Sequence, residues 1–555
     1  MSLQQSGQGR RFATTDAVDF VVIGSGPAGG SVARELTRLG HDVLVLEQGK
    51  AYSRGEFTHD ELEVFFHNKY TNNPPDHIQT YRRTPDEKAQ TRTYLQYAQA
   101  VGGSSMHYAA NYWRFRPIDF VEFSRKGGVP GAELADWPID YDELEPYYSA
   151  VEWAVGVSGQ GGVDPGEGRR SRPYPMPPLD ITGPGVLMEV GARKMGWRAL
   201  PAPMAITSRP YKGRDACHNC GFCWFFPCEW GAKSGTNFTM VPEAVATGRC
   251  EVRTECKVRR IETDARGRVT GVTYFDRDRR EVLQRARVVF LCANGAESPR
   301  LLLMSKSSRF PDGLANGSGV VGKHLMFNGN TAGNGEFEHE VNGHKGPPVT
   351  RIVLDTYELD KEGFIGGGGY DFRYPFPPIL AMLSLPEGTP QWGSAFKATM
   401  RRMHTRTAYC WGHATQLPVA TNGVDLDPDV KDGWGLPAMR VTFKEHEHDL
   451  RMFRYLHDRG IDLLKAAGAI RTWGTPPGDN PGGAVHMLGT CRMGNDPRTS
   501  VVDKYHRAHE VPNLFVVDGS SFVTAGRGQP TLTIQALAFR AADHASRMAQ
   551  RGELG

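Results

Sequence analysis

The stretch DFVVIGSGPAGGSVARELTRLGHDVLVLEQGK, residues 19–50, constrains the fold of this chain more than any other. Its opening run DFVVI is typical of a buried parallel strand, the middle has helical spacing, and HDVLVLE has the pattern of a second strand. Three glycines in a GxGxxG pattern join the first strand to the helix: Gly24, Gly26 and Gly29. The sequence therefore predicts an α/β fold whose first βαβ unit binds a dinucleotide.

The residue types in this unit suit a nucleotide with a pyrophosphate. Glycines permit a tight turn and let backbone N–H groups approach the pyrophosphate at the start of the helix. Glu47, about 20 residues after the motif, suits hydrogen bonds from ribose hydroxyls, and its charge would repel a 2′-phosphate. The motif thus argues against NADP and leaves FAD and NAD open.

Length and composition limit the remaining possibilities. A chain of 555 residues is too long for one hydrophobic core, so two or more domains are expected. The net charge of +3 is close to balance and argues against a nucleic-acid partner. No run approaches the ~18 apolar residues of a membrane span. No apolar segment precedes the first strand, so we expect no cleavable export signal in the chain itself.

Four of the nine cysteines fall within one short stretch, CHNCGFCWFFPC: Cys217, Cys220, Cys223 and Cys228. The odd total and the missing export signal disfavour a disulfide framework. A zinc site would need a second pair of ligands, whereas a compact run with two-residue spacings is typical of iron–sulfur clusters, which prefer soft thiolates. We expect an Fe–S cluster in residues 215–231. Disulfides or free thiols in an apolar loop are the alternative.

Four further motifs, in order along the chain, resemble those of the glucose–methanol–choline (GMC) oxidoreductase family. VGGSSMHYAANYWRF (101–115) is similar to the family's flavin-lining segment, and VVFLCANGAESPRLLLMS (288–305) to its second signature. HMLGTCRMG (486–494) resembles the segment with the catalytic histidine. LFVVDGSSFVTAGRGQPTLTIQALAFRAADHA (514–545) resembles the final strand, turn and helix. The resemblance extends from residue 19 to the C-terminus.

The resemblance implies a Rossmann-like FAD-binding domain and an α+β substrate domain with a mixed or antiparallel sheet. The FAD-binding domain would comprise residues 15–55, 95–130, 215–330 and 480–555. The substrate domain would comprise residues 56–94, 131–214 and 331–479. Besides the βαβ unit, the implied FAD contacts are Gly102, Gly103, Ser104, His107, Asp518, Gly519, Pro530 and Thr531.

Two residues carry the implied chemistry, which is hydride transfer from an alcohol carbon to flavin N5. His486 is the candidate base for the hydroxyl proton, because the pKa of imidazole is near working pH. Gln529 stands where the family usually has Asn or His. A glutamine positions a hydroxyl but is not a base.

His107 lies where pyranose oxidases and some bacterial sugar dehydrogenases of the family attach the flavin covalently. A covalent bond and a non-covalent contact remain equally open.

The cysteine-rich segment resembles an insert, typically holding [3Fe–4S], in the large subunits of bacterial dehydrogenases for fructose, gluconate, sorbitol, glucose and glucosides. This resemblance implies a sugar or glycoside dehydrogenase, and it favours oxidation at C3 of a pyranoside. The electrons would leave through the cluster to a cytochrome, quinone or dye. It also implies a small partner subunit with the export signal, and a periplasmic or membrane-associated location; the alternative is cytoplasmic. An oxidase that reduces O2 and a non-catalytic Fe–S electron-transfer component are the alternative functions.

Overall fold

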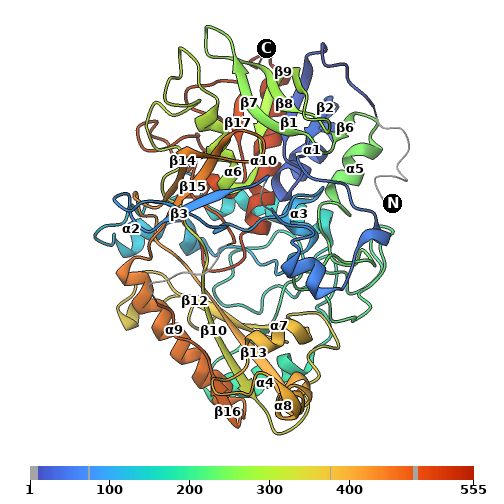
Figure 1. Ribbon diagram of the computed structural model, residues 1–555, viewed down its shortest axis with the longest axis vertical. Coiled ribbons are helices and arrows are strands. Elements are labelled where there is room, and N and C mark those ends of the chain that lie inside the picture. Colours follow the sequence, from blue (N-terminus) through green and yellow to red (C-terminus); the bar gives the residue numbers. More distant parts are fainter. Residues whose placement is uncertain (1–9, 73–75, 375–376, 479–484, 555) are drawn as a thin grey trace.

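The structure, a computed structural model, describes residues 10–72, 76–374, 377–478 and 485–554. Figure 1 shows the first strands and the last helix together in the upper half, and a second sheet with a long helix beside it in the lower half. Chain segments from both ends and from the middle of the sequence therefore build the upper part.

The upper sheet has seven strands in the order β6-β2-β1-β9-β8-β7, with β17 paired to β9. Its parallel part consists of β1 (Val18–Ile23), β2 (Val43–Leu46), β6 (Cys250–Arg253), β9 (Glu281–Leu291) and β17 (Leu514–Val516). Two antiparallel strands extend it, β7 (Lys257–Thr263) and β8 (Val269–Phe275). The predicted βαβ unit and parallel sheet are confirmed.

Helices cover the apolar strands of this sheet. Parallel strands are buried on both faces, which explains their continuous apolar runs. The helix α1 (Pro27–Arg38) packs against α5 (Met240–Ala246) and α10 (Thr531–Gln550), and α10 also packs against α3 (Tyr141–Val155). The first and last helices of the chain are thus neighbours, as Figure 1 shows.

The turn from β1 into α1 requires glycine for two different reasons. Gly24 has φ +94°, a conformation that other residues rarely adopt. A Cβ atom on Gly29 would lie 1.9 Å from the carbonyl oxygen of Gly24, so the helix could not approach the strand. Pro27 begins the helix, where its fixed φ and missing N–H cost nothing.

The lower sheet is antiparallel and has six strands in the order β16-β10-β13-β12-β11-β5. These are β16 (Arg471–Trp473), β10 (Gly329–Glu336), β13 (Thr407–Ala414), β12 (Gly368–Arg373), β11 (Arg351–Val353) and β5 (Ala199–Pro201). The helices α9 (Glu447–Ala466) and α4 (Gly183–Lys194) pack on it. The predicted substrate-domain sheet of mixed or antiparallel type is confirmed.

A third sheet has four strands in the order β14-β15-β3-β4. They are β14 (Gly423–Lys431), β15 (Pro437–Thr442), β3 (Gln79–Arg82) and β4 (Gln90–Thr91). The remaining helices are α2 (Glu122–Lys126), α6 (Asn294–Met304), α7 (Pro378–Leu383) and α8 (Gly393–Arg406). Short helical turns are η1 (Arg54–Glu56), η2 (Leu62–Phe66), η3 (Gly103–Met106), η4 (Pro117–Phe120), η5 (Asp360–Glu362) and η6 (Gly519–Ser521). Within the described ranges, no helix is both long enough and apolar enough to cross a bilayer.

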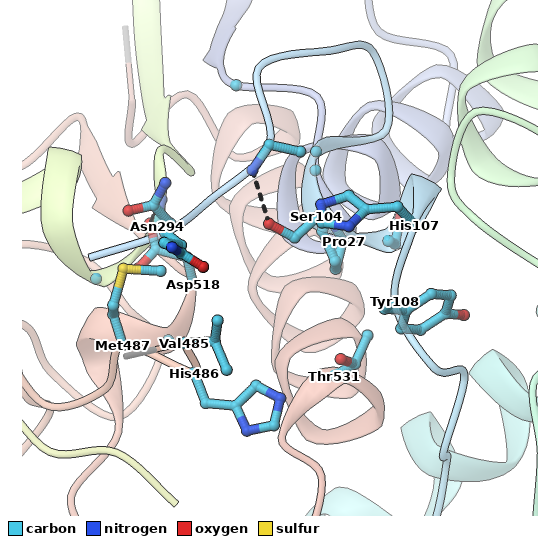
Figure 2. A pocket seen from close by; sticks show the side chains of 18 of the residues that line it. Pro27, Ser104, His107, Tyr108, Asn294, Val485, His486, Met487, Asp518 and Thr531 are labelled. Atoms are coloured by element: carbon cyan, nitrogen blue, oxygen red, sulfur yellow. Dashed lines mark hydrogen bonds between the residues drawn. The ribbon is translucent and has the colours of Figure 1, made fainter. Parts of the chain in front are cut away.

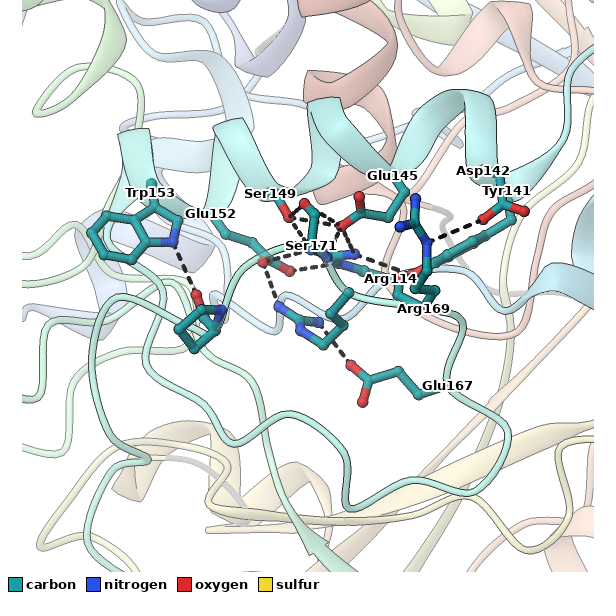
Figure 3. A network of polar contacts seen from close by, with 12 residues as sticks. Arg114, Tyr141, Asp142, Glu145, Ser149, Glu152, Trp153, Glu167, Arg169 and Ser171 are labelled. Atoms are coloured by element: carbon teal, nitrogen blue, oxygen red, sulfur yellow. Dashed lines mark hydrogen bonds and ion pairs between the residues drawn. The ribbon is translucent and has the colours of Figure 1, made fainter.

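A buried polar network fastens the extended segment after residue 107 to α3 (Figure 3). Arg114 donates from Nε to Glu152 Oε1 at 2.8 Å and from Nη1 to Glu145 Oε1 at 3.0 Å. It also donates to Ser149 Oγ at 3.0 Å. Because a buried guanidinium without partners would be strongly destabilising, these contacts fix the path of the segment.

Candidate active site

A cavity of about 600 Å³ lies where the parallel strands β1 and β2 end. Open α/β sheets bind ligands at this edge. Helix N-termini and loops from distant parts of the chain complete its wall, among them the start of α10 and the segments around residues 104 and 486 (Figure 2). All predicted catalytic and cofactor-binding residues line the cavity except Gly29 and Gly102.

Glu47 holds the glycine turn in place and also lines the cavity. Its Oε2 accepts hydrogen bonds from the Ser25 backbone N–H at 2.9 Å and the Ser25 hydroxyl at 2.6 Å. Its Oε1 accepts from the Gly49 backbone N–H at 2.8 Å. Burial raises the pKa of Glu47, and these donors oppose that shift. The carboxylate keeps lone pairs for ribose hydroxyls.

Asp518 plays a similar part at the end of β17. Its Oδ2 accepts from the Asn294 backbone N–H at 3.0 Å and from the Ser298 hydroxyl at 2.6 Å. Its Oδ1 accepts from the Ser520 backbone N–H at 2.7 Å. Burial raises the pKa of Asp518. The residue therefore joins the final strand to the start of α6 at the cavity wall.

The segment before α10 is locked by close packing. A Cβ atom on Gly528 would lie 1.9 Å from the indole nitrogen of Trp113. Arg527 is fully buried and donates to Asp119 at 2.5 Å. Gln529, directly before the helix, is therefore held in a fixed position at the wall. The N-terminus of this long helix offers free N–H groups and a positive dipole end to the cavity.

His486 faces the cavity with an unusual backbone, since its φ is +60°. Figure 2 shows its imidazole on the side of the cavity where α10 begins with Thr531. The ring Nδ1 has no hydrogen-bond partner among the described residues. Burial is the main cause that lowers the pKa of His486 to about 3, with smaller contributions from the neighbouring His413 and Arg373. The imidazole is therefore neutral at neutral pH, and positive φ outside glycine is typical of functional positions.

A hydrogen-bonded chain that the sequence did not predict runs from the lower sheet to Gln529. The amide Nε2 of Gln529 lies 2.8 Å from Nδ1 of His413, and Nε2 of His413 lies 2.7 Å from Oδ2 of Asp371. Arg373 pairs with the same carboxylate. One sequence signal could have pointed to this chain, because Asp371, Arg373 and His413 are charged or polar residues in strand-forming runs.

Arg373 also connects the lower sheet to the cysteine-rich segment. Its guanidinium lies over the ring of Trp224 at 4.6 Å and over the ring of Trp411 at 5.0 Å. All three side chains line the cavity. Trp224 directly follows Cys223 in the sequence, and the structure brings it to the cavity wall.

Known proteins match this architecture over almost its whole length. Two family models, each described as GMC oxidoreductase, match residues 18–326 and 418–538. The chain belongs to the GMC oxidoreductase family. It is an FAD-dependent oxidoreductase that acts on alcohol groups, as the resemblance of its motifs implied.

Several proteins of the family are similar to this GMC oxidoreductase in length and sequence. It is 36% identical to 2-methyl-1,2-propanediol dehydrogenase of Mycolicibacterium austroafricanum, over 96% of each chain. It is 30% identical to the fructose dehydrogenase large subunit of Gluconobacter japonicus, over 95% of this chain and 98% of that one. It is 31% identical to paromamine 6′-oxidase of Streptomyces fradiae, over 94% and 90%. A formate oxidase variant of Aspergillus oryzae RIB40 has the same fold, with TM-score 0.66 and 15% identity over 98% and 100% of the chains.

The residues that line the cavity of this GMC oxidoreductase suit the chemistry of FAD. Gly24, Gly26 and Gly103 line it without side chains, and a Cβ atom on Gly103 would lie 2.9 Å from Cα of Gly26. Two buried imidazole nitrogens at the wall, Nε2 of His107 and Nδ1 of His486, have no partner among the described residues. A bare backbone, a helix N-terminus and unpaired polar atoms are what a large polar cofactor requires.

His107 lies in the cavity wall close to Ser104, whose hydroxyl accepts from the Ala98 backbone N–H at 3.1 Å (Figure 2). Burial lowers the pKa of His107 to about 3, with a further contribution from the charge of Lys233. The imidazole is therefore neutral, the form in which its nitrogen is nucleophilic. The covalent bond stays a prediction.

The cysteine-rich segment does not form a metal site in this structure. All four thiols are free; Cys223 is buried and Cys220 is exposed. Among the described residues, no group of three or more His, Cys, Asp or Glu side chains is arranged to hold a metal ion. The expected Fe–S cluster is therefore not supported, and we assign no catalytic step to it.

Lys233 lies behind this segment and was missed by the sequence analysis. It is fully buried and donates to the backbone carbonyls of Tyr108, Cys223 and Phe226 at 2.8, 2.7 and 2.6 Å. Burial lowers its pKa to about 8. One ammonium group thus ties the cysteine-rich segment to the segment that follows His107.

Proposed function

We propose that the protein is a dehydrogenase that oxidises a hydroxyl of a sugar, glycoside or similar polyol. The observation that carries the proposal is a neutral, cavity-facing His486 beside the start of α10, whose Nδ1 has no hydrogen-bond partner among the described residues. The names of the relatives support the substrate class, since they include a propanediol dehydrogenase, a fructose dehydrogenase subunit and a paromamine oxidase.

His486 and Gln529 have different roles in the proposed reaction. FAD, held by the glycine turn at Gly24 and Gly26 and by Glu47, would supply a two-electron acceptor for hydride from the substrate carbon. His486 accepts the hydroxyl proton on its unprotonated nitrogen, so that the C–O bond becomes a carbonyl. Gln529 hydrogen-bonds a substrate oxygen and holds the carbon in position.

Within this class we propose a secondary hydroxyl at C3 of a pyranoside as the reacting group. The support is the similarity of the GGSSMHY segment to pyranose oxidases. Anaerobic bleaching of the flavin by glucose, methyl glucoside, fructose, sorbitol, gluconate and inositol tests it. Methyl glucoside cannot react at C1. Bleaching by glucose but not by methyl glucoside would therefore show that C1, and not C3, is the carbon oxidised. Bleaching by none of these alcohols would reject the proposed function.

The second candidate function is an oxidase that passes electrons to O2. The similarity to paromamine 6′-oxidase favours it. Oxygen consumption and dye reduction, measured with the same substrate, separate the two. Fast dye reduction with slow oxygen consumption supports the dehydrogenase.

We further propose that the protein works with a partner subunit that carries an export signal, which would place it in the periplasm or at a membrane. The similarity to a fructose dehydrogenase large subunit supports a partner. A [3Fe–4S] cluster at the four cysteines is supported only by their spacing. Analysis of the purified protein for iron and acid-labile sulfide tests the cluster, and co-purification of a small subunit from the native host tests the partner. Absence of iron and sulfide would reject the cluster, and full activity of the isolated chain in the cytoplasm would reject the partner.

A further inference from the structure

We propose that His413, held by Asp371, is a positioning residue that fixes the amide of Gln529 with its carbonyl oxygen free for a second substrate hydroxyl. The site would then select substrates with two adjacent hydroxyls. This inference rests on the proposed function of His486 as the base for the reacting hydroxyl.

The first step concerns the protonation of His413. Asp371 accepts two hydrogen bonds from Arg373 and one from Asn111, whose Nδ2 lies 3.2 Å from Oδ2, so the carboxylate is ionised and accepts only. Its Oδ2 also faces Nε2 of His413 at 2.7 Å, which must therefore carry a proton. Burial lowers the pKa of His413 although Asp371 raises it, so the ring is neutral and Nδ1 is bare.

The second step concerns the orientation of Gln529. A bare Nδ1 accepts a hydrogen bond, and the amide nitrogen of Gln529 lies 2.8 Å from it. The amide of Gln529 must therefore direct an N–H toward Nδ1 of His413. In the flipped orientation, its carbonyl oxygen would face the lone pair of Nδ1 and be repelled. The carbonyl oxygen has no hydrogen-bond partner among the described residues, and Gln529 lines the cavity. Donating one N–H also strengthens the carbonyl as an acceptor.

The third step concerns what this carbonyl can bind. The reacting hydroxyl gives its proton to His486 and develops negative charge on oxygen. A carbonyl oxygen facing it would repel that charge. The carbonyl therefore suits a hydroxyl that keeps its proton throughout, which is a neighbour of the reacting one. A substrate with adjacent hydroxyls can satisfy both residues at once.

The surroundings make this arrangement rigid. The ring of His413 packs edge-on against Trp113, with centroids 5.5 Å apart. The same indole blocks any side chain at Gly528, next to Gln529. His413 and Asp371 lie on adjacent strands, β13 and β12, and both are buried. Neither end of the Gln529–His413 contact can move without disturbing this packing.

The experiment uses pairs of alcohols that differ by one hydroxyl: 1,2-propanediol with 1-propanol, and trans-1,2-cyclohexanediol with cyclohexanol. We expect the holoenzyme to prefer the diol in kcat/KM by about 10-fold or more, the value of one good hydrogen bond. His413→Leu should remove most of this preference while FAD content stays normal. His413→Asn, which keeps an acceptor near the position of Nδ1, should restore part of it.

Two controls separate orientation from folding. His339→Leu replaces an exposed histidine and should leave the preference unchanged. Asp371→Asn keeps the size of the side chain but frees His413 to take the other tautomer, so it should lower the preference like His413→Leu. If Asp371→Asn does not fold, the two His413 variants still test the inference. A wild type without diol preference, or a His413→Leu protein that keeps it, overturns the inference.

The tautomer of His413 provides a readout without turnover. In protein with ¹⁵N-labelled histidine, the signals lost in His413→Asn should show a protonated Nε2 and a bare Nδ1 at neutral pH. A protonated Nδ1 overturns the inference even if diols are good substrates. If no alcohol reduces the flavin, the proposed function fails instead, and the tautomer still tests the orientation of Gln529.

Discussion

Replacing Gly26 by alanine should separate cofactor binding from folding within one motif. Gly26 lines the cavity, and among the described residues, its two chain neighbours apart, only Gly103 has an atom, Cα at 3.8 Å, within 4 Å of a Cβ atom built on it. Its φ of −64° suits alanine. The methyl group would therefore occupy cavity space rather than clash with protein, and the free energy of unfolding of the apoprotein should change by less than about 0.5 kcal/mol.

The effect on FAD should be large. A methyl group at this point keeps the pyrophosphate away from the backbone N–H groups at the start of α1. Each charge-assisted hydrogen bond is worth about 1.5–3 kcal/mol, so losing two costs about 3–6 kcal/mol. The affinity for FAD should fall about 10²- to 10⁴-fold. If FAD is covalently attached, the same defect appears as a lower flavin content of the purified protein.

Gly29→Ala is the contrasting variant and Gly55→Ala the matched control. A Cβ atom on Gly29 would lie 1.9 Å from the Gly24 carbonyl oxygen, so this variant should destabilise the apoprotein by about 1–3 kcal/mol or more. Apart from its chain neighbours, no described residue has a heavy atom within 4 Å of a Cβ atom built on Gly55, so Gly55→Ala should change neither the stability of the apoprotein nor its affinity for FAD. Urea denaturation of the apoprotein measures its stability, and titration with FAD measures the affinity. A Gly26→Ala protein that binds FAD normally, or that loses as much stability as Gly29→Ala, would refute the reasoning.

Three further predictions concern histidines. His486→Ala should slow flavin reduction by substrate about 10²- to 10⁴-fold while FAD content and substrate binding persist, as stopped-flow spectroscopy would show; near-normal reduction removes His486 from the mechanism. If FAD is attached at His107, the flavin of the wild type should precipitate with the protein in acid and that of His107→Ala should not; free flavin from the wild type rejects the bond. His506 is buried, neither ring nitrogen has a partner among the described residues, and burial lowers its pKa from 6.5 to about 3. The unfolded state therefore binds the proton more readily, and stability is lost as pH falls below 6.5, by about 2 kcal/mol at pH 5. His506→Leu should reduce the acid-induced loss by that amount in denaturation at pH 7.5 and pH 5, and an unchanged loss would show that the ring is already solvated.

The sequence by itself determined the dinucleotide-binding unit and the family. The glycine spacing, the apolar runs and Glu47 are local signals, because strand, turn and helix lie next to one another in the chain. The HMLGTCRMG segment likewise named His486, and the structure brings it to the same cavity as Gly24 and Thr531. The predicted FAD contacts Gly29 and Gly102 are not among the residues that line the cavity, a distinction that only packing makes.

Only the tertiary structure decided the chain from Gln529 through His413 to Asp371. His413 and Asp371 each lie more than a hundred positions from Gln529 in the sequence. The three residues meet because β12 and β13 pair beneath the start of α10. The same holds for Trp224, which reaches the cavity through its contact with Arg373. The cysteine spacing predicted a metal site, but spacing fixes neither the direction nor the burial of the thiols. Contacts between distant segments follow from how sheets and helices pack, and local sequence patterns do not encode that packing.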